Sequence, residues 1–150
     1  MTGERGPEGG EALDVVDELT EALVEFYEKL SSWEHSVSRG KGLTLPQLHA
    51  IEILGMHGGL TMKELAGKTG VTTGALTVLV DGLEGKGLVE RRPHERDRRS
   101  IRVLLTEAGR LRSQDHHKLH RQLTQEIATA FDPAETAQLA ALLRKALDRF

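Results

Sequence analysis

Residues 61–106 read TMKELAGKTGVTTGALTVLVDGLEGKGLVERRPHERDRRSIRVLLT, and this stretch decides the fold. Thr61 and Glu64 have the spacing of a capping box at the start of a short helix, which Gly70 ends. A second helix, GALTVLVDGLEGKG, follows a short connection around that glycine. Two helices joined in this way have the spacing of a helix-turn-helix.

Two strands and a charged loop come after the second helix. LVERR and IRVLL have strand character, because Ile101, Val103 and Leu105 alternate with residues such as Arg102. The link between them, PHERDRRS, is too long for a two-residue turn and is rich in arginine. This order is that of a winged helix-turn-helix, so we expect the chain to bind double-stranded DNA.

Composition limits the other classes of protein. The 150 residues are 38% hydrophobic, enough for one ordinary domain, and only 3% aromatic, which favours helices with aliphatic stripes. The absence of cysteine excludes disulfides, thiolate metal sites, cysteine nucleophiles and thiol-based oxidant sensors. No run is apolar for long enough to form a membrane helix, and the N-terminus lacks the core of a signal peptide, so we expect a cytoplasmic protein.

The net charge of −3 hides a strong local asymmetry. Residues 1–34 hold ten acidic and two basic residues, whereas residues 86–102 hold seven basic and three acidic residues. Attraction to phosphate decays within about 10 Å at moderate salt, so the local balance of +4 matters more for DNA than the total charge.

Long helical patterns flank the winged stretch. We expect a disordered tail over residues 1–11 and a single domain over residues 12–150, with its DNA-binding part near 44–106. Helices near 12–37 and 106–150 carry more apolar residues than the small winged core can cover. The predicted fold class is mainly α with a small β-hairpin, a winged helix-turn-helix flanked by N- and C-terminal helices that form a homodimer.

The second helix of the motif has two faces. Its period places an apolar set inside: Ala75, Leu76, Leu79, Val80 and Leu83. It leaves a second set largely outside: Thr73, Gly74, Thr77, Val78 and Asp81.

The segments ELAGKTGVTTGALTVLVDGLEGKGLVERR and DRRSIRVLLTEAGR resemble the MarR family of bacterial transcriptional regulators. The second segment is similar to the family's wing signature, in which Asp, any residue and Arg precede an apolar strand that ends in Leu-Thr. The resemblance implies a dimer built from the terminal helices, a recognition helix in the major groove and a wing arginine in the minor groove. It therefore implies a sequence-specific transcriptional regulator, which we expect to be a repressor that binds a pseudo-palindromic operator.

The resemblance also assigns wing residues. Arg99 would enter the minor groove and Asp97 would orient it, while Arg96 and Arg98 would lie beside the DNA backbone. A planar guanidinium suits a narrow, electronegative groove.

The recognition helix departs from the family pattern at Val78 and Gly82, where the family often has cationic or larger polar residues. This departure moves the expected DNA contacts to the wing and to a group of small residues: Thr72, Thr73, Gly74 and Thr77. Among these, Gly74 would permit close approach to the DNA backbone.

Three histidines lie together in HHKLH, residues 116–120. On a helix, His116 and His120 share one face beside an apolar stripe, whereas His117 points about 100° away. Two imidazoles at this spacing can bind one metal ion, and His49 is expected to point inward from an earlier helix. The alternative is a solvated HHKLH face and a structural His49.

The histidines resemble the zinc-responsive branch of the family. That resemblance implies a ligand set of Glu34 or His35 with His49, His116 and His120, and Asp115 could join a second, weaker site. Nitrogen and oxygen ligands without cysteine suit Zn²⁺, although Ni²⁺, Co²⁺ and Mn²⁺ stay open. We expect the ion to tie three helices together and to favour DNA binding, as a co-repressor.

Two other effector and partner classes stay open. A small aromatic or phenolic ligand could bind near Trp33, Tyr27 and His49, and the winged fold could also serve as a protein-interaction module without DNA. An enzyme is not expected, because the chain has no HExxH motif, no phosphate-binding glycine loop and no serine elbow.

Overall fold

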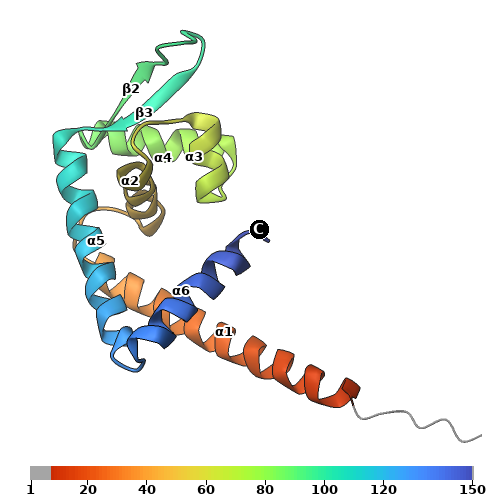
Figure 1. Cartoon of the computed structure of the whole chain (residues 1–150). Coiled ribbons are helices and arrows are strands. Elements are labelled where there is room, and N and C mark those ends of the chain that lie inside the picture. Colours follow the sequence, from red (N-terminus) through yellow and green to blue (C-terminus); the bar gives the residue numbers. More distant parts are fainter. Residues whose placement is uncertain (1–7, 150) are drawn as a thin grey trace, which may run out of the picture. The chain divides into compact units, whose positions relative to one another are not determined.

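The structure is a computed structural model that describes residues 8–149. In chain order its elements are α1 (Glu8–Ser38), α2 (Leu45–His57), β1 (Leu60–Thr61), α3 (Met62–Thr69), α4 (Thr73–Gly85), β2 (Val89–Pro93), β3 (Ile101–Leu105), α5 (Glu107–Ala128) and α6 (Pro133–Leu147). This order confirms the predicted mainly helical fold with a small sheet (Figure 1). The helix-turn-helix and the hairpin lie where the sequence placed them.

Backbone contacts divide the described chain into two compact units, one that ends at Leu45 and one that begins at Pro46. The first unit consists mainly of α1, and the second holds the winged region together with α5 and α6. α1 begins at Glu8, so residues 8–11 are helical rather than part of the expected tail. The glycines there lower helix propensity without stopping the helix. The rest of that tail, residues 1–7, lies outside the described residues.

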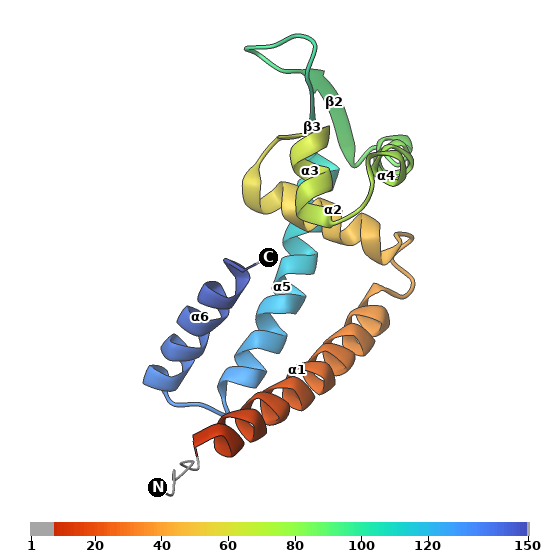
Figure 2. The same cartoon turned by 90° about the vertical axis from the view of Figure 1, so that its right-hand side faces the viewer.

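The sheet has three antiparallel strands in the order β1-β3-β2. Val103 at the centre of β3 pairs with Leu60 on one side and Arg91 on the other. In both views β2 and β3 form a hairpin that extends beyond α3 and α4 (Figures 1 and 2). β1 was not predicted from the sequence, because two residues are too short to show alternation and their pairing partner, β3, lies far along the chain.

The helix ends of the motif form as expected. The Thr61 side chain accepts a hydrogen bond from the Glu64 backbone, and the Glu64 carboxylate accepts one from Thr61 N at 2.8 Å. This hydrogen bond from the Thr61 backbone, with a second one from the Thr61 hydroxyl, lowers the pKa of Glu64 below its ordinary value. Gly70 ends α3 in the left-handed conformation with φ of 70°, and Thr72 caps α4 by accepting from Ala75 N.

The core of the second unit is aliphatic, as the composition indicated. Its buried residues come from every element between α2 and β3: Leu48, Ala50, Ile51, Leu54, Leu60, Leu65, Leu76, Val80, Leu83, Leu88, Val89, Val103 and Leu105. One expectation was wrong in detail: Ala75, which the helical period placed on the inner face of α4, is exposed.

Close backbone contacts attach α5 to the winged region. Gly109 packs so tightly that an added Cβ would collide with the carbonyl oxygen of Leu88. Thr106 N donates to the same oxygen at 3.1 Å, and the Thr106 hydroxyl donates to Gly87 O at 2.6 Å. One face of α5 is therefore fixed to the turn that follows α4.

Gly109→Ala should destabilise the protein by about 1–3 kcal/mol, because the new methyl group meets a backbone atom that cannot rotate away. Chemical denaturation followed by circular dichroism measures this loss. Gly67→Ala is the matched control, since an added Cβ on α3 there meets nothing within 4 Å. Equal stability of the Gly109→Ala variant and the wild type would contradict the contact.

Candidate nucleic-acid interface and metal centre

The outer face of α4 is the first candidate for contact with DNA. Leu76, Val80 and Leu83 anchor the opposite face in the core, and α4 packs against α3 and β2. The exposed set agrees with the expectation: Thr73, Gly74, Thr77, Val78 and Asp81. The helix therefore presents small and uncharged side chains over most of its free surface.

Hydroxyl groups on this face already have backbone partners. The Thr72 hydroxyl oxygen accepts from Ala75 N at 3.2 Å, and the Thr77 hydroxyl donates to Thr73 O at 3.0 Å. Each oxygen keeps lone-pair capacity, so both threonines can still accept a hydrogen bond from a base or a bridging water. Thr72 also keeps its hydroxyl proton for donation, whereas the Thr77 proton is already engaged by Thr73 O.

An ion-pair clamp fixes α4 to the hairpin. The Arg91 guanidinium on β2 contacts the carboxylates of Asp81 at 2.6 Å and Glu84 at 2.5 Å, both on α4. Partial burial acts to lower the pKa of Arg91, but the hydrogen bonds to Asp81 and Glu84 outweigh it and raise that pKa above its ordinary value. Arg91 thus sets the position of the recognition helix and is not a free charge for phosphate.

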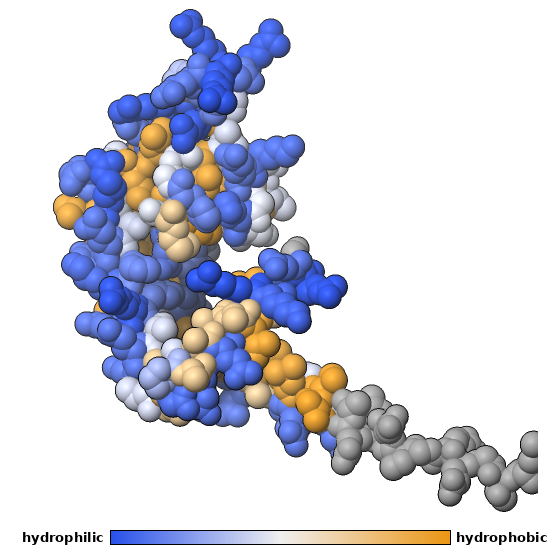
Figure 3. Space-filling view, in the orientation of Figure 1, coloured by the Kyte–Doolittle hydropathy of each residue, from blue (hydrophilic) through white to orange (hydrophobic). Residues whose placement is uncertain are grey.

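The tip of the hairpin is the second candidate. Arg96, Arg98 and Arg99 are exposed in the loop between β2 and β3. Hydrophilic side chains cover this end of the second unit (Figure 3). Asp97 shapes the loop by accepting from Arg99 N at 3.0 Å, so its observed contact with Arg99 is made to the backbone rather than to the guanidinium.

The other bases of the +4 segment have local partners. Arg92 pairs with Glu90 at 2.7 Å, Arg102 donates to Gly59 O at 2.7 Å, and Lys86 donates to the Gln47 side chain at 3.2 Å. Gln47 also explains Gly82, because a Cβ added there would lie 2.8 Å from its amide nitrogen. Arg102 and Lys86 keep their charge, because their partners are neutral. The three exposed arginines of the hairpin tip form the largest group of cations in this segment that pair with no carboxylate of the described residues.

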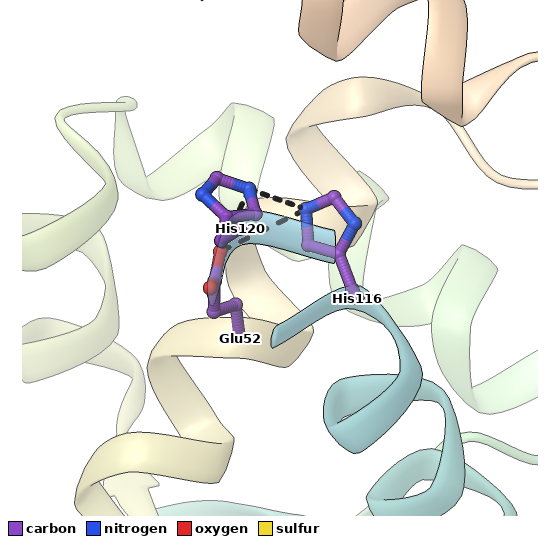
Figure 4. A group of neighbouring side chains, drawn as sticks. All are labelled: Glu52, His116 and His120. Carbon is purple, nitrogen blue, oxygen red and sulfur yellow. Dashed lines mark hydrogen bonds and ion pairs between the residues drawn. The ribbon is translucent and has the colours of Figure 1, made fainter. Parts of the chain in front are cut away.

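A cluster of metal-binding side chains lies between α2 and α5. His116 and His120 on α5 turn toward Glu52 on α2 (Figure 4). The two Nε2 atoms lie 3.1 Å apart, and each lies 3.7 Å from Glu52 Oε2. His116 is 1% exposed, Glu52 14% and His120 27%, so the cluster is shielded from solvent without being sealed.

His117 also reaches this cluster, from outside. Its Nδ1 atom lies 3.7 Å from Glu52 Oε1, although its side chain is exposed. A cavity of about 200 Å³ beside it is lined by Glu52, Gly55, Met56, Ser113, Gln114 and His117. An ion could reach the cluster through this opening.

The histidine pair was predicted from the sequence, but Glu52 was not. A signal was present, because Glu52 is the single acidic residue of the mainly apolar α2 and lies three positions after His49. His49 is half-buried on α2 but is not in the cluster, and Glu34 and His35 lie on α1 in the other unit. Their predicted roles as ligands stay predictions.

Comparison with known proteins identifies the family. The MarR family model matches residues 43–101, which span the helix-turn-helix, β2 and the loop as far as the first residue of β3. The multiple antibiotic resistance protein MarR of Salmonella typhimurium is 34% identical over 106 residues, covering 70% of this chain and 74% of that protein. The chain belongs to the MarR family.

Other MarR-type proteins match over greater lengths. An uncharacterised HTH-type transcriptional regulator of Bacillus subtilis, YcgE, is 28% identical and covers 87% of this chain and 88% of its own. The structure of Streptococcus pneumoniae FabT in complex with DNA superimposes with a TM-score of 0.77 at 26% identity, covering 89% of this chain and 95% of that one. The protein is a DNA-binding transcriptional regulator of the MarR type and not an enzyme. Within residues 8–149, no helix has the length and apolar character needed to cross a membrane.

Arg99→Ala should weaken binding to duplex DNA of any sequence and reduce the slope of log affinity against log salt by about one, because one cationic contact is lost. Fluorescence anisotropy over a salt series measures both. Arg92→Ala is the matched control, because it removes the same charge from the same hairpin at a residue that already contacts Glu90; a larger loss for Arg99→Ala assigns the DNA contact to the hairpin tip. An Arg99→Ala variant with wild-type affinity and slope would exclude this arginine from the interface.

Proposed function

We propose that the protein is a cytoplasmic, homodimeric repressor that binds a pseudo-palindromic operator and that a bound metal ion such as Zn²⁺ modulates its affinity for DNA. The proposal has three parts: the dimer, the metal site and the link between them. The observation that carries the metal part is the Glu52, His116 and His120 cluster.

Exposed apolar side chains on the terminal helices support the dimer. α1 exposes one set: Val15, Val16, Leu19, Leu23, Val24, Phe26 and Tyr27. α6 exposes a second: Leu139, Leu142, Leu143 and Leu147. Figure 3 shows the apolar stripe along α1. Surfaces of this kind are rare on monomeric proteins, and a second copy of the chain is the partner that a two-fold operator requires.

The geometry of the cluster suits a tetrahedral ion. Metal bonds of 2.0–2.1 Å separate neighbouring ligand atoms by about 3.3 Å in a tetrahedron. The three distances in the cluster are 3.1, 3.7 and 3.7 Å, so small side-chain movements would complete the arrangement. Two histidines and a carboxylate leave a further ligand position, which His49 or a water molecule could fill.

The cluster lies where it can influence the recognition helix. An ion held by Glu52 and the histidines would tie α2 to α5, close to the point where Gly55 packs against Ser113. α5 is in turn fixed to the turn after α4 through Thr106 and Gly109. An ion that binds one arrangement of these helices more tightly than another shifts the population toward it.

A small aromatic ligand has less support. Tyr27 is 66% exposed on α1, and neither it nor Trp33 lines the cavity beside the cluster. The metal ion is therefore the effector that we propose.

Zinc should bind the wild-type protein and raise its affinity for DNA, and Glu52→Gln should lower the affinity for zinc at least about tenfold. Isothermal titration with zinc and DNA-binding assays with and without chelator measure the two effects. The paired substitution His116→Ala and His120→Ala should abolish the response, whereas His57→Ala, at the exposed end of α2, should leave it intact. Identical zinc responses in the wild type and the double variant would contradict the site.

Leu142→Glu should produce a folded monomer, because this leucine is exposed in a single chain and its change costs no intrachain core contact. Light scattering measures the mass and circular dichroism the helix content. Affinity for a two-site operator should fall about a hundredfold, since the half-sites are no longer bound as a linked pair. Gln138→Glu adds the same charge on α6 and should leave the dimer intact; a dimeric Leu142→Glu variant would argue against this interface.

A further inference from the structure

Val78 is the most exposed large apolar side chain of residues 14–149, at 73%. Most of the others lie on α1 and α6, where the proposed dimer covers them. Val78 instead lies on the outer face of α4, opposite the buried Leu76, Val80 and Leu83. Neither the core nor the proposed dimer accounts for its exposure.

The rest of this face lacks the side chains that usually read bases by paired hydrogen bonds. Residues 73–82 read TGALTVLVDG and contain no Arg, Lys, Asn or Gln. The Thr77 hydroxyl proton is engaged by Thr73 O, and Asp81 is engaged by Arg91. This face therefore offers a base edge threonine oxygens and a set of methyl groups, and Val78 is its one large exposed apolar side chain.

Gly74 lies one helical turn before Val78 and is further evidence that this face of α4 contacts another molecule. An added Cβ there would meet nothing within 4 Å, and its backbone does not have a positive φ. Neither packing nor backbone conformation therefore requires glycine at this place, although glycine disfavours the helix. Its absent side chain lets the backbone of α4 approach an external surface more closely, which brings Val78 nearer to it.

The major groove displays one apolar group, the C5 methyl of thymine. We propose that Val78 reads a thymine in each half-site by direct contact of its methyl groups with that C5 methyl. The inference rests on the proposed operator binding and adds to it the chemical feature that α4 recognises. Wing arginines then supply affinity for any duplex, and Val78 supplies discrimination.

The test uses a duplex selected by the wild-type protein from a random pool, in which each thymine is replaced in turn by deoxyuridine. This replacement removes the methyl group and keeps the hydrogen-bonding edge. At one thymine per half-site, affinity should fall about fourfold, the effect of losing one buried methyl group. Val78→Ala should weaken binding to the thymine duplex by a similar factor and should not distinguish thymine from deoxyuridine there.

Arg99→Ala is the matched control, because it should weaken binding to every duplex and still show the full deoxyuridine penalty. Wild-type protein that tolerates deoxyuridine at every position, or a Val78→Ala variant that keeps the full penalty, would overturn the inference while operator binding stands. Failure to select any duplex would overturn the proposed function and this inference with it. Circular dichroism verifies that Val78→Ala folds, as expected for an exposed residue replaced by a better helix former.

Discussion

The contact between the first turn of α5 and the backbone that ends α4 is the constraint on which the arrangement of the winged region depends. Gly87 turns the chain with φ of 69°, and its carbonyl accepts from the Thr106 hydroxyl. Leu88 O accepts from Thr106 N and touches Gly109. The recognition helix and the histidine-bearing helix therefore share one fixed point. A side chain larger than hydrogen at position 109 would separate them.

This contact lies only a short distance from the proposed metal site, so it can connect that site to the recognition helix. His116 follows Thr106 by ten residues, which corresponds to about 15 Å along a helix. An ion bound by Glu52, His116 and His120 would add a second point of attachment, between α5 and α2. With α5 fixed near Gly109 and tied to α2 near His116, its tilt relative to α2 would be restricted. Regulation of this kind needs a coupling free energy of only about 1–3 kcal/mol.

Features that depend on neighbouring residues were predictable, and those that depend on distant pairing were not. The capping box of Thr61 and Glu64, the left-handed Gly70 and the basic loop are local patterns, and the structure has them. Strand β1 was missed because its register is set by Val103, more than forty residues later. Arg91 was counted as a free charge for the same reason, since its partners lie on another element. Glu52 was missed because its neighbours in the cluster, His116 and His120, lie on another helix more than sixty residues later.

The positive charge lies on the hairpin and the apolar contact surface on α4, so the distance between the two copies of α4 in the proposed dimer is important for specificity. Three exposed arginines at the hairpin tip attract any duplex, whereas α4 offers methyl groups and threonine acceptors in place of cationic or amide readers. Each recognition helix alone therefore discriminates weakly between sequences, because a methyl contact contributes less than a paired hydrogen bond. Specificity then depends on two such helices fitting two half-sites together. A metal ion between α2 and α5 would change how well the two recognition helices fit the two half-sites. Because one helix alone discriminates weakly between sequences, such a change would strongly alter the affinity of the proposed dimer for its operator.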